Sequence, residues 1–349
     1  MDNLNISKER NHTVNQDERS YIEVLVNEIN EEHKNMDANA LLIYDVKLDL
    51  KDEITGESIY NLEDPIENVL KYRNDFSKLG MSFECDVAIR TMVIFSKIFP
   101  YVTRDGRDIE LQKCEGEDNP YQYNHKKLKF QIGNLKEHEY VYRGDIMNSY
   151  MGTINAYKRA FGEELPNEAR MFVGFAHTIG NMTPVPFVRK GEEFNSPRGL
   201  DNKIINDYWD LTLLAIYNWF LKQNGKVPMY ELNLIDVVQT KESVLMCEKW
   251  LGNFKNKNGK LSWDEFVRRN FMGAFVEKQE TLSCDNEESV YGMPKELWDN
   301  HFKTFRDETR PVSKEEYMQF FTNAKTAISQ RGYRISKALI RAQRKEMNF

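Results

Sequence analysis

Apolar side chains recur at steps of three and four residues through most of the chain after residue 140, and this spacing constrains the fold more than any other feature. Side chains at such steps share one face of an α-helix, and that face must be buried against another element. Five segments of this kind begin at Met147, Trp209, Val244, Phe266 and Tyr317. The first two end at Gly162 and at Asn224-Gly225, because glycine tolerates the left-handed backbone that follows a helix.

Two of the predicted helices are preceded by Ser-x-x-Glu, whose side chains can satisfy the free backbone amides at the start of a helix. The two pairs are Ser262 with Glu265 and Ser313 with Glu316. The first pair follows an Asn-Gly turn and also resembles an EF-hand calcium loop, with asparagines at two ligand positions. Such a loop needs an acidic first ligand, where this chain has Phe254. We therefore expect a plain turn followed by a capped helix.

Alternation of apolar and polar residues, the pattern of a strand with one face in water, occurs in two places. Residues 40–50 alternate and predict a single strand. Residues 128–142 alternate on both sides of Gly133-Asn134 and predict a β-hairpin. Residues 87–99 satisfy both the strand and the helix pattern. The fold class is therefore α+β, with mostly helical C-terminal two-thirds and a small mixed or antiparallel β element.

The chain has 349 residues, more than one typical domain, so we expect one large domain or two fused ones. Residues 1–18 are polar and predict a flexible tail. Residues 19–126 predict a mixed α/β N-terminal part, which ends in a polar, turn-rich stretch. Residues 127–349 predict a mainly helical domain that carries the hairpin and a cluster of polar motifs.

Composition excludes several classes of protein. Lysine and arginine number 48 against 55 acidic residues, and the net charge of −7 argues against a surface that is basic throughout, although a local basic patch remains compatible with it. No apolar run approaches the roughly 18 residues of a membrane span, and the first residues lack the apolar core of a signal peptide. The four cysteines form no Cys-x-x-Cys pair, so neither a cysteine zinc site nor a disulfide framework is expected. We expect a cytoplasmic protein without a membrane partner.

A stripe of basic residues follows one side of the predicted C-terminal helix. It consists of Arg334, Lys337, Arg341, Arg344 and Lys345. Such a stripe predicts binding to the phosphates of a nucleic acid or to an acidic protein surface. The alternative is a solvated helix face, because basic residues are favoured near helix C-termini by the helix dipole alone.

Polar residues with apolar neighbours gather between residues 137 and 211. The candidates for binding or catalysis among them are His138, Arg143, Asp145, Asn148, His177, Asn181, Asn195, Arg198, Asp207 and Trp209. Burying such polar groups without partners costs several kcal/mol, roughly, so they are expected to pair with one another, to bind a ligand, or both. A purely structural role, with Asn148 capping a helix and Asn181 ordering a turn, is the main alternative.

Four strings in this region carry a resemblance to a known group of proteins. They are YRGDIMNSY, HTIGN, FNSPRG and DYWDLTL. Their succession resembles an uncharacterised family of bacterial and phage-borne proteins. The resemblance implies a protein of a bacterial or phage element, and one class of function that we consider is a non-enzymatic interaction protein in phage defence or counter-defence.

Part of the same region is similar to the HNH-type nuclease domains of modification-dependent restriction systems. Glu137-His138 matches the Glu-His pair of those domains, residues 180–183 match their Gly-Asn-x-Thr segment, and Asn195 with Lys203 match the later Asn and Lys. Residues 139–141 stand where those domains have Ile-x-Pro. The resemblance implies a metal-dependent phosphodiesterase acting on nucleic acid, with a histidine as the base that activates water and Mg²⁺ or Mn²⁺ at the scissile phosphate.

On this hypothesis the candidate catalytic residues are His138, His177 and Arg143. The candidate metal ligands are Asp145, His177 and Asn181, which offer oxygen or imidazole donors of suitable kind. A third class of function, an enzyme that uses NAD or a small molecule, is suggested by residues 142–144, which resemble the NAD-binding arginine strand of ADP-ribosyltransferases. The Ser-Thr-Ser and Glu-x-Glu segments of those enzymes do not follow it in this chain.

Overall fold

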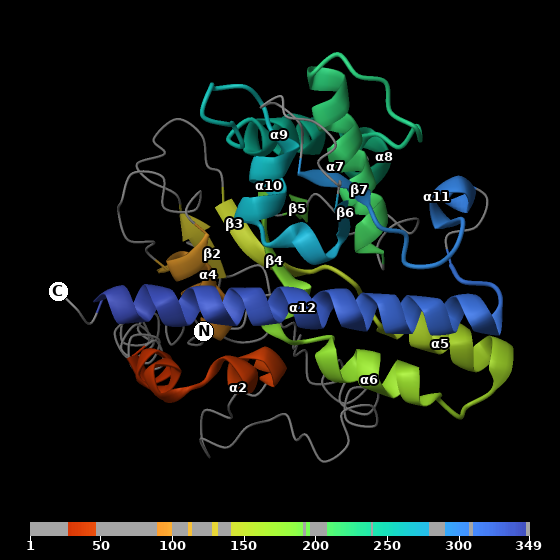
Figure 1. Ribbon diagram of the computed structural model, residues 1–349, viewed down its shortest axis with the longest axis horizontal. Helices are drawn as coiled ribbons and strands as arrows, with labels where there is room; N and C mark the ends of the chain where they lie inside the picture. Colours follow the sequence, from red (N-terminus) through yellow and green to blue (C-terminus); the bar gives the residue numbers. More distant parts are fainter. Residues whose placement is uncertain are drawn as a thin grey trace, which may run out of the picture.

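The computed structural model describes ten stretches of the chain, which together contain the helices and strands discussed below. These are residues 27–46, 89–99, 111–113, 128–131, 141–190, 193–195, 208–238, 240–278, 290–306 and 310–346. Within them the fold is α+β, with helices packed around an antiparallel sheet (Figure 1). This agrees with the fold class predicted from the sequence. No helix in these stretches is long and apolar enough to cross a bilayer.

The longest element is α12 (Lys314–Glu346), a helix of 33 residues that runs along the long axis of the molecule (Figure 1). Its apolar side packs against α2 (Ala38–Ile43), α4 (Ile89–Ile98), α6 (Asn167–Phe175) and the short 3₁₀ helices η3 (Ile179–Asn181) and η4 (Met272–Ala274). The residues that α12 buries include Tyr317, Phe320, Phe321, Ala324, Ile328, Ile335 and Leu339. Their spacing is the one that predicted the helix.

The N-terminus of α12 is closed by the predicted capping box. Ser313 Oγ accepts a hydrogen bond from the amide of Glu316 at 3.1 Å, and Glu316 Oε2 accepts from the amides of Ser313 at 3.2 Å and Val312 at 2.7 Å. Three backbone donors that a helix start leaves free are thus satisfied. The prediction of this helix start is confirmed.

The main sheet has five strands in sequence order, all antiparallel: β1 (Leu111–Lys113), β2 (Leu128–Gln131), β3 (Val141–Ile146), β4 (Met182–Lys190) and β5 (Glu193–Asn195). Phe130 lies opposite Tyr142, so β2 and β3 form the predicted pairing, while the Gly133-Asn134 turn lies outside the described residues. β4 begins at the end of η3, so the sheet is connected directly to the segment that α12 covers. A second, two-stranded sheet pairs β6 (Val276–Lys278) with β7 (Tyr291–Pro294).

The remaining helices are α5 (Met151–Phe161), α7 (Trp209–Gln223), α8 (Leu234–Val238), α9 (Lys241–Leu251), α10 (Trp263–Arg269) and α11 (His301–Thr304). α5 and α7 end where predicted, since Gly162 and Gly225 have φ of +103° and +70°. The turn before α10 also has the predicted form. Asn256 Oδ1 accepts from the amides of Asn258 and Lys260, and Ser262 caps the helix.

The same turn is not built as a calcium loop. Glu265, which would supply the bidentate ligand, is held by the guanidinium groups of Arg268 at 2.6 Å and Arg269 at 2.9 Å. The hydrogen bonds from Arg268 and Arg269 and the positive charges of the two groups lower the pKa of the Glu265 carboxyl. The carboxylate is therefore already neutralised within its own helix.

The structure corrects the strand predicted over residues 40–50 and assigns a type to the ambiguous segment that follows residue 87. The strand predicted over residues 40–50 is wrong in its first part, because Ala40 to Ile43 belong to α2. Asp37 caps that helix by accepting from the amides of Asn39 and Ala40, a local interaction that outweighs the alternating pattern. Residues 47–50 lie outside the described stretches. Residues 89–98, which satisfied both patterns, form a helix.

The helix predicted around Phe266 is short, although apolar residues at helical spacing continue to Phe271 and Phe275. α10 ends at Arg269, and Phe271 has a φ of +58°, in the left-handed region that a phenylalanine rarely adopts. The chain then turns into η4, which lies against α12. The change of direction at Phe271 therefore brings η4 under the helix.

The backbones of η3 and α12 approach closely at two glycines. A Cβ on Gly180 would lie 2.1 Å from the carbonyl oxygen of Ile328 and 2.9 Å from the amide of Gly332. A Cβ on Gly332 would lie 2.8 Å from the Leu42 side chain. Only glycine fits at Gly180, since backbone atoms on a packed helix cannot move aside cheaply.

We expect Gly180→Ala to lower the free energy of unfolding by about 2 kcal/mol or more, because the added methyl group overpacks the contact between η3 and α12. The matched control is Gly174→Ala in α6, where a Cβ meets nothing within 4 Å and where alanine is the better helix former. Urea unfolding of both variants measures the difference. Equal stabilities for the two variants would contradict the close packing.

The buried His33 side chain makes the stability of the fold depend on pH. It is buried, and neither ring nitrogen has a hydrogen-bond partner among the described residues. Burial and the nearby charges of Arg90 and Lys97 lower its pKa from 6.5 to about 3. The unfolded chain therefore takes up a proton at a pH where the folded chain does not, so stability present above pH 6.5 is lost as the pH falls from there toward about 3.

Replacing His33 by leucine removes this proton uptake from the unfolded state. Relative to the wild type, His33→Leu should gain stability as the pH falls, by at most about 1.4 kcal/mol for each pH unit. Urea unfolding of both proteins between about pH 7 and about pH 4.5 measures the trend. A difference that stays constant over this range would show that His33 does not remain neutral in the fold.

Candidate functional site

Asn148 and Asn181, the asparagine pair, come from two of the polar motifs and are bonded to each other. Asn181 Oδ1 accepts from the amide of Asn148 at 3.0 Å, and its Nδ2 donates to the carbonyls of Asn148 at 2.9 Å and Ala176 at 2.8 Å. Both side chains are fully buried. The Asn181 side chain therefore joins the end of β3 to η3, and both of its amide protons are already used.

The asparagine pair also holds the start of α7. Asn148 Oδ1 accepts from the amide of Trp209, the first residue of that helix, at 3.1 Å. Trp209 is fully buried. Three motifs that lie far apart in the sequence thus meet at one buried point, where their polar groups satisfy backbone atoms.

His177, which lies just before η3, is buried and contacts the N-terminal part of the chain. Its Nδ1 lies 3.3 Å from Asp45 Oδ2, and the ring of Tyr150 packs edge-on against the imidazole with centroids 5.1 Å apart. The amide of Val46 donates to the carbonyl oxygen of His177 at 3.1 Å. His177 therefore ties residues 45–46 to the segment that precedes η3.

The structure brings Asn148, His177, Asn181 and Trp209 into one buried region, and it places the other predicted site residues less completely. Arg143 and Asp145 lie on β3 opposite Val185 and Thr183, and Asn195 lies on β5 opposite Val188, but their side chains are outside the described part. His138, Arg198 and Asp207 are wholly outside it.

The proposed metal ligands were Asp145, His177 and Asn181. Asn181 does not fit this role as it stands, because its amide group is occupied by backbone partners. In the stretches that the structure covers, no group of three or more His, Cys, Asp or Glu side chains is arranged to hold a metal ion.

Arg331 is a residue whose position sequence reasoning missed. Its guanidinium is fully buried and donates to the carbonyls of Met182 at 2.6 Å, Gly180 at 2.9 Å and Asn270 at 3.1 Å. A signal was present in the sequence: position 331 falls three residues after Ile328 and four before Ile335, on the apolar side of α12. It is thus separate from the basic stripe.

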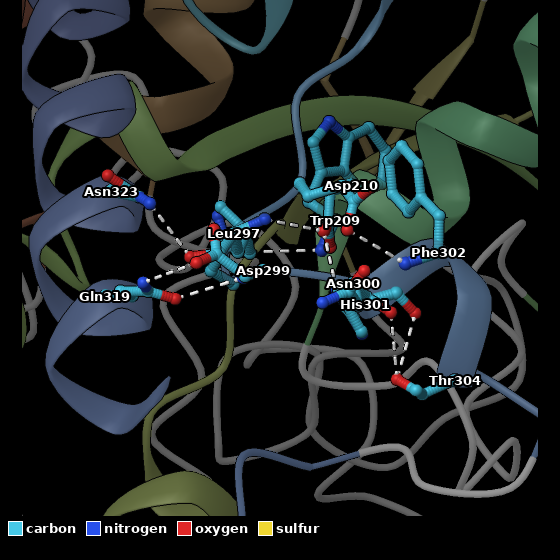
Figure 2. Close-up of polar contacts among 12 residues, drawn as sticks. Trp209, Asp210, Leu297, Asp299, Asn300, His301, Phe302, Thr304, Gln319 and Asn323 are labelled. Carbon is cyan, nitrogen blue, oxygen red and sulfur yellow. Dashed lines mark hydrogen bonds and ion pairs between the residues drawn. The ribbon is translucent and has the colours of Figure 1, made fainter. Parts of the chain in front are cut away.

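A second missed interaction joins α7 to the segment before α11. Asp210 Oδ2 accepts from the amide of Leu297 at 3.0 Å and lies 2.7 Å from Nδ1 of His301, and both side chains are fully buried (Figure 2). The ring of Trp298 stacks on the His301 imidazole with centroids 3.4 Å apart. Residues 295–301 are therefore held in a fixed conformation. The partners are 91 positions apart, so no local pattern in the sequence indicates this contact.

The same segment is also fixed to α12. Gln319 Nε2 donates to Asp299 Oδ2 at 3.0 Å while its Oε1 accepts from the Asp299 amide at 3.0 Å, and Asn323 Nδ2 donates to the carbonyl of Leu297 at 3.0 Å (Figure 2). Glu296 Oε2 accepts from the amide of Phe302 at 3.3 Å. Partial burial raises the pKa of the Glu296 carboxyl.

Between this segment and α12 lies an open pocket of about 620 Å³, which we call the α12 pocket. Three walls form it: the outer side of α12, the η4 to β6 segment, and residues 295–300. The lining residues are Ala274, Phe275, Glu277, Lys295, Glu296, Leu297, Asp299, Asn300, Asn323, Thr326, Ala327 and Gln330. The volume is in the range of pockets that hold small ligands.

The exposed side of α12 continues from the pocket into Arg334, Lys337 and Arg341, which we call the cationic stripe. The Arg334 guanidinium lies against Gly273 of η4, next to the pocket wall, since a Cβ on that glycine would meet Arg334 at 2.5 Å. Lys337 Nζ lies 4.3 Å from the centroid of the Tyr333 ring, which is 40% exposed. Arg344 and Lys345 extend the helix, with side chains outside the described part.

None of the three cations in the stripe forms an ion pair with a carboxylate in the described parts of the chain. By contrast, Arg268, Arg269 and Arg306 on other exposed surfaces are paired with glutamates. The outer face of α12 therefore combines unpaired positive charge, an exposed aromatic ring and a pocket.

Comparisons with models of protein families, with curated proteins and with solved structures gave no match to this chain. Function must therefore be inferred from the geometry and charge of its own residues.

Proposed function

We propose that the protein binds nucleic acid through the outer face of α12. The observation that carries this proposal is the cationic stripe, three exposed cations on one helix face that have no carboxylate partner among the described residues, in a chain of net charge −7. A cation that is already paired must give up its partner to bind a phosphate. An unpaired one only releases the counterions of the nucleic acid, which favours binding.

The spacing of the stripe supports a phosphate backbone as the ligand. Arg334 and Arg341 are seven residues apart, so the stripe rises by about 10 Å along the helix axis. In a duplex, successive phosphates of one strand are separated by about 3.4 Å along the axis, so the stripe spans about three of them. The exposed ring of Tyr333 lies within the stripe, where it can contact a sugar or a base.

The solvated-face alternative explains the stripe less completely. The helix dipole favours cations in the last turn of a helix, but Arg334 lies three turns before the end of α12. It also lies against η4 rather than extending freely into water. The dipole therefore does not account for the position of the residue closest to the pocket.

The hypothesis of a metal-dependent phosphodiesterase stays a prediction beside this proposal. The side chains of His138, Arg143, Asp145 and Asn195, on which it mainly depends, lie outside the described residues. Nucleic-acid binding by α12 is compatible with cleavage elsewhere on the chain, but it does not require it.

Charge reversal of the stripe tests the proposal. The variant Arg334→Glu/Lys337→Glu/Arg341→Glu should bind a mixed-sequence oligonucleotide at least about tenfold more weakly at ~50 mM salt, and log Kd should depend less steeply on log salt because fewer phosphates are neutralised. Fluorescence anisotropy with single-stranded and duplex DNA and RNA measures both effects.

The matched control is Lys226→Glu/Lys257→Glu/Lys260→Glu, which changes the net charge equally at exposed lysines that have no ion pair within the part of the chain that the structure describes. It should bind within about threefold of the wild type at the same salt concentration. Equal losses in the two triple variants would show a general charge effect and contradict a site on α12. Absence of binding to all four ligands would overturn the proposal and favour an acidic protein surface as the partner of the stripe.

The same samples test cleavage. On the nuclease hypothesis, the oligonucleotide is cut when Mg²⁺ or Mn²⁺ is added and stays intact when EDTA is present. Binding without cleavage under either metal would remove the enzyme from consideration and leave the binding protein.

A further inference from the structure

We infer that the nucleic acid bound by α12 is single-stranded and that the α12 pocket receives one of its bases, preferably a base with an exocyclic amino group. This inference rests on the proposed function and specifies the ligand of the same face. The proposed function uses only the cationic stripe, and this inference adds the α12 pocket to the same binding site.

The pocket has the wrong charge for a phosphate. Three carboxylates, those of Glu277, Glu296 and Asp299, line it. The single lysine in its wall, Lys295, directs its ammonium group toward the carbonyl of Ala274 at 3.4 Å. Carboxylates repel phosphate oxygens, so only an uncharged part of a polyanion bound on the stripe can enter the pocket. In a nucleic acid that part is a base.

The pocket also has the groups that read a base edge. The side chains of Glu277, Thr326 and Gln330 form no hydrogen bond in the stretches that the structure covers. Asn323 uses its amino group on Leu297, which leaves its carbonyl oxygen as an acceptor. Carboxylates and amide oxygens accept from the amino groups of cytosine and adenine. Thymine and uracil present carbonyl oxygens there, which carboxylates repel.

Two of the three walls of the pocket are held in place before any ligand binds. Leu297 is held by Asp210 through its amide and by Asn323 through its carbonyl, and Asp299 is held by Gln319 through two hydrogen bonds (Figure 2). A second wall belongs to α12 itself, and the η4 to β6 segment forms the third. Groups that are already fixed lose little conformational freedom on binding, which favours a specific ligand.

The distance between pocket and stripe fits a single nucleotide unit. Gln330 lines the pocket and Arg334 begins the stripe one helical turn later, a rise of about 6 Å. A base can therefore enter the pocket while its flanking phosphates lie along the stripe. In a duplex the base is paired and stacked inside the helix, so entry requires a single strand or an extruded base.

Filling the pocket tests the inference. Thr326 is exposed on α12 and lines the pocket, so Thr326→Phe places a ring in it, whereas Thr322→Phe places the same ring one turn earlier, outside the lining residues. The probes are d(CA)10, (dT)20 and a mixed-sequence duplex of 20 base pairs, compared by fluorescence anisotropy at one salt concentration. Urea unfolding confirms that both variants fold.

The wild type should bind d(CA)10 about fivefold or more tightly than (dT)20 or the duplex, the lower end of the discrimination given by one base contact. Thr326→Phe should lose this preference while its salt dependence stays unchanged, because the phosphate contacts remain. Thr322→Phe should keep the preference. Glu277→Gln should reduce the preference and leave binding to (dT)20 unaltered or slightly stronger.

Failure of this inference and failure of the proposed function give different results. Equal affinity for the three probes, or a preference that survives Thr326→Phe, overturns the base pocket while the loss of binding on charge reversal of the stripe persists. Tighter binding of the duplex than of both single strands overturns the single-stranded ligand. Absence of binding to every probe overturns the base pocket together with the proposed function.

Discussion

The fold depends on a buried guanidinium. Arg331 donates hydrogen bonds to four backbone carbonyls, two in η3, one at the start of β4 and one in the turn after α10. η3 and β4 follow each other directly, whereas the turn after α10 is about ninety residues further along the chain. One side chain of α12 therefore fixes the sheet and the α10 region against the helix, and the glycines at 180 and 332 allow the backbones to come close enough. A charged group in this position is costly to bury, and its several hydrogen bonds offset that cost.

The two sides of α12 have different roles in the fold and in the proposed binding. The inner side carries aromatic and aliphatic residues together with Arg331, and its position is set by burial. Because an α-helix is a rigid element, fixing the inner side also fixes the outer side, where the cationic stripe and one wall of the α12 pocket lie. The buried Asp210–His301 pair fixes the opposite wall in the same manner. The candidate site thus needs no mobile loop to form, and its shape follows from the core.

Local signals in the sequence predicted much of the fold. The capping boxes at Ser262 and Ser313, the glycines after α5 and α7, and the pairing of β2 with β3 depend on residues that are close together, so pattern and propensity sufficed. The stripe was found for the same reason. The strand expected over residues 40–50 failed because the cap at Asp37 extended a helix into an alternating sequence. Periodicity alone does not include such competition between local interactions.

The contacts that build the site could not be predicted in the same way. Asp210 and His301 are 91 positions apart, and Arg331 and Gly180 are 151 apart, so only the folded chain brings them together. The polar motifs show that a correctly predicted buried residue can still have a role other than the predicted one. The sequence predicts Asn148 and Asn181 as binding residues because buried polar groups need partners. In the fold Asn181 bonds to backbone groups through both ends of its amide, whereas Asn148 uses its Oδ1 and its Nδ2 has no partner among the described residues.

Arg331 stabilises the fold, whereas Arg334, three residues further along the same helix, does not. Urea unfolding of Arg331→Met and Arg334→Met, measured side by side, tests it most directly. We expect Arg331→Met to lower the free energy of unfolding by about 3 kcal/mol or more, because four backbone carbonyls lose their donor. Arg334→Met should change it by less than about 0.5 kcal/mol. Similar small effects for both substitutions would contradict the account.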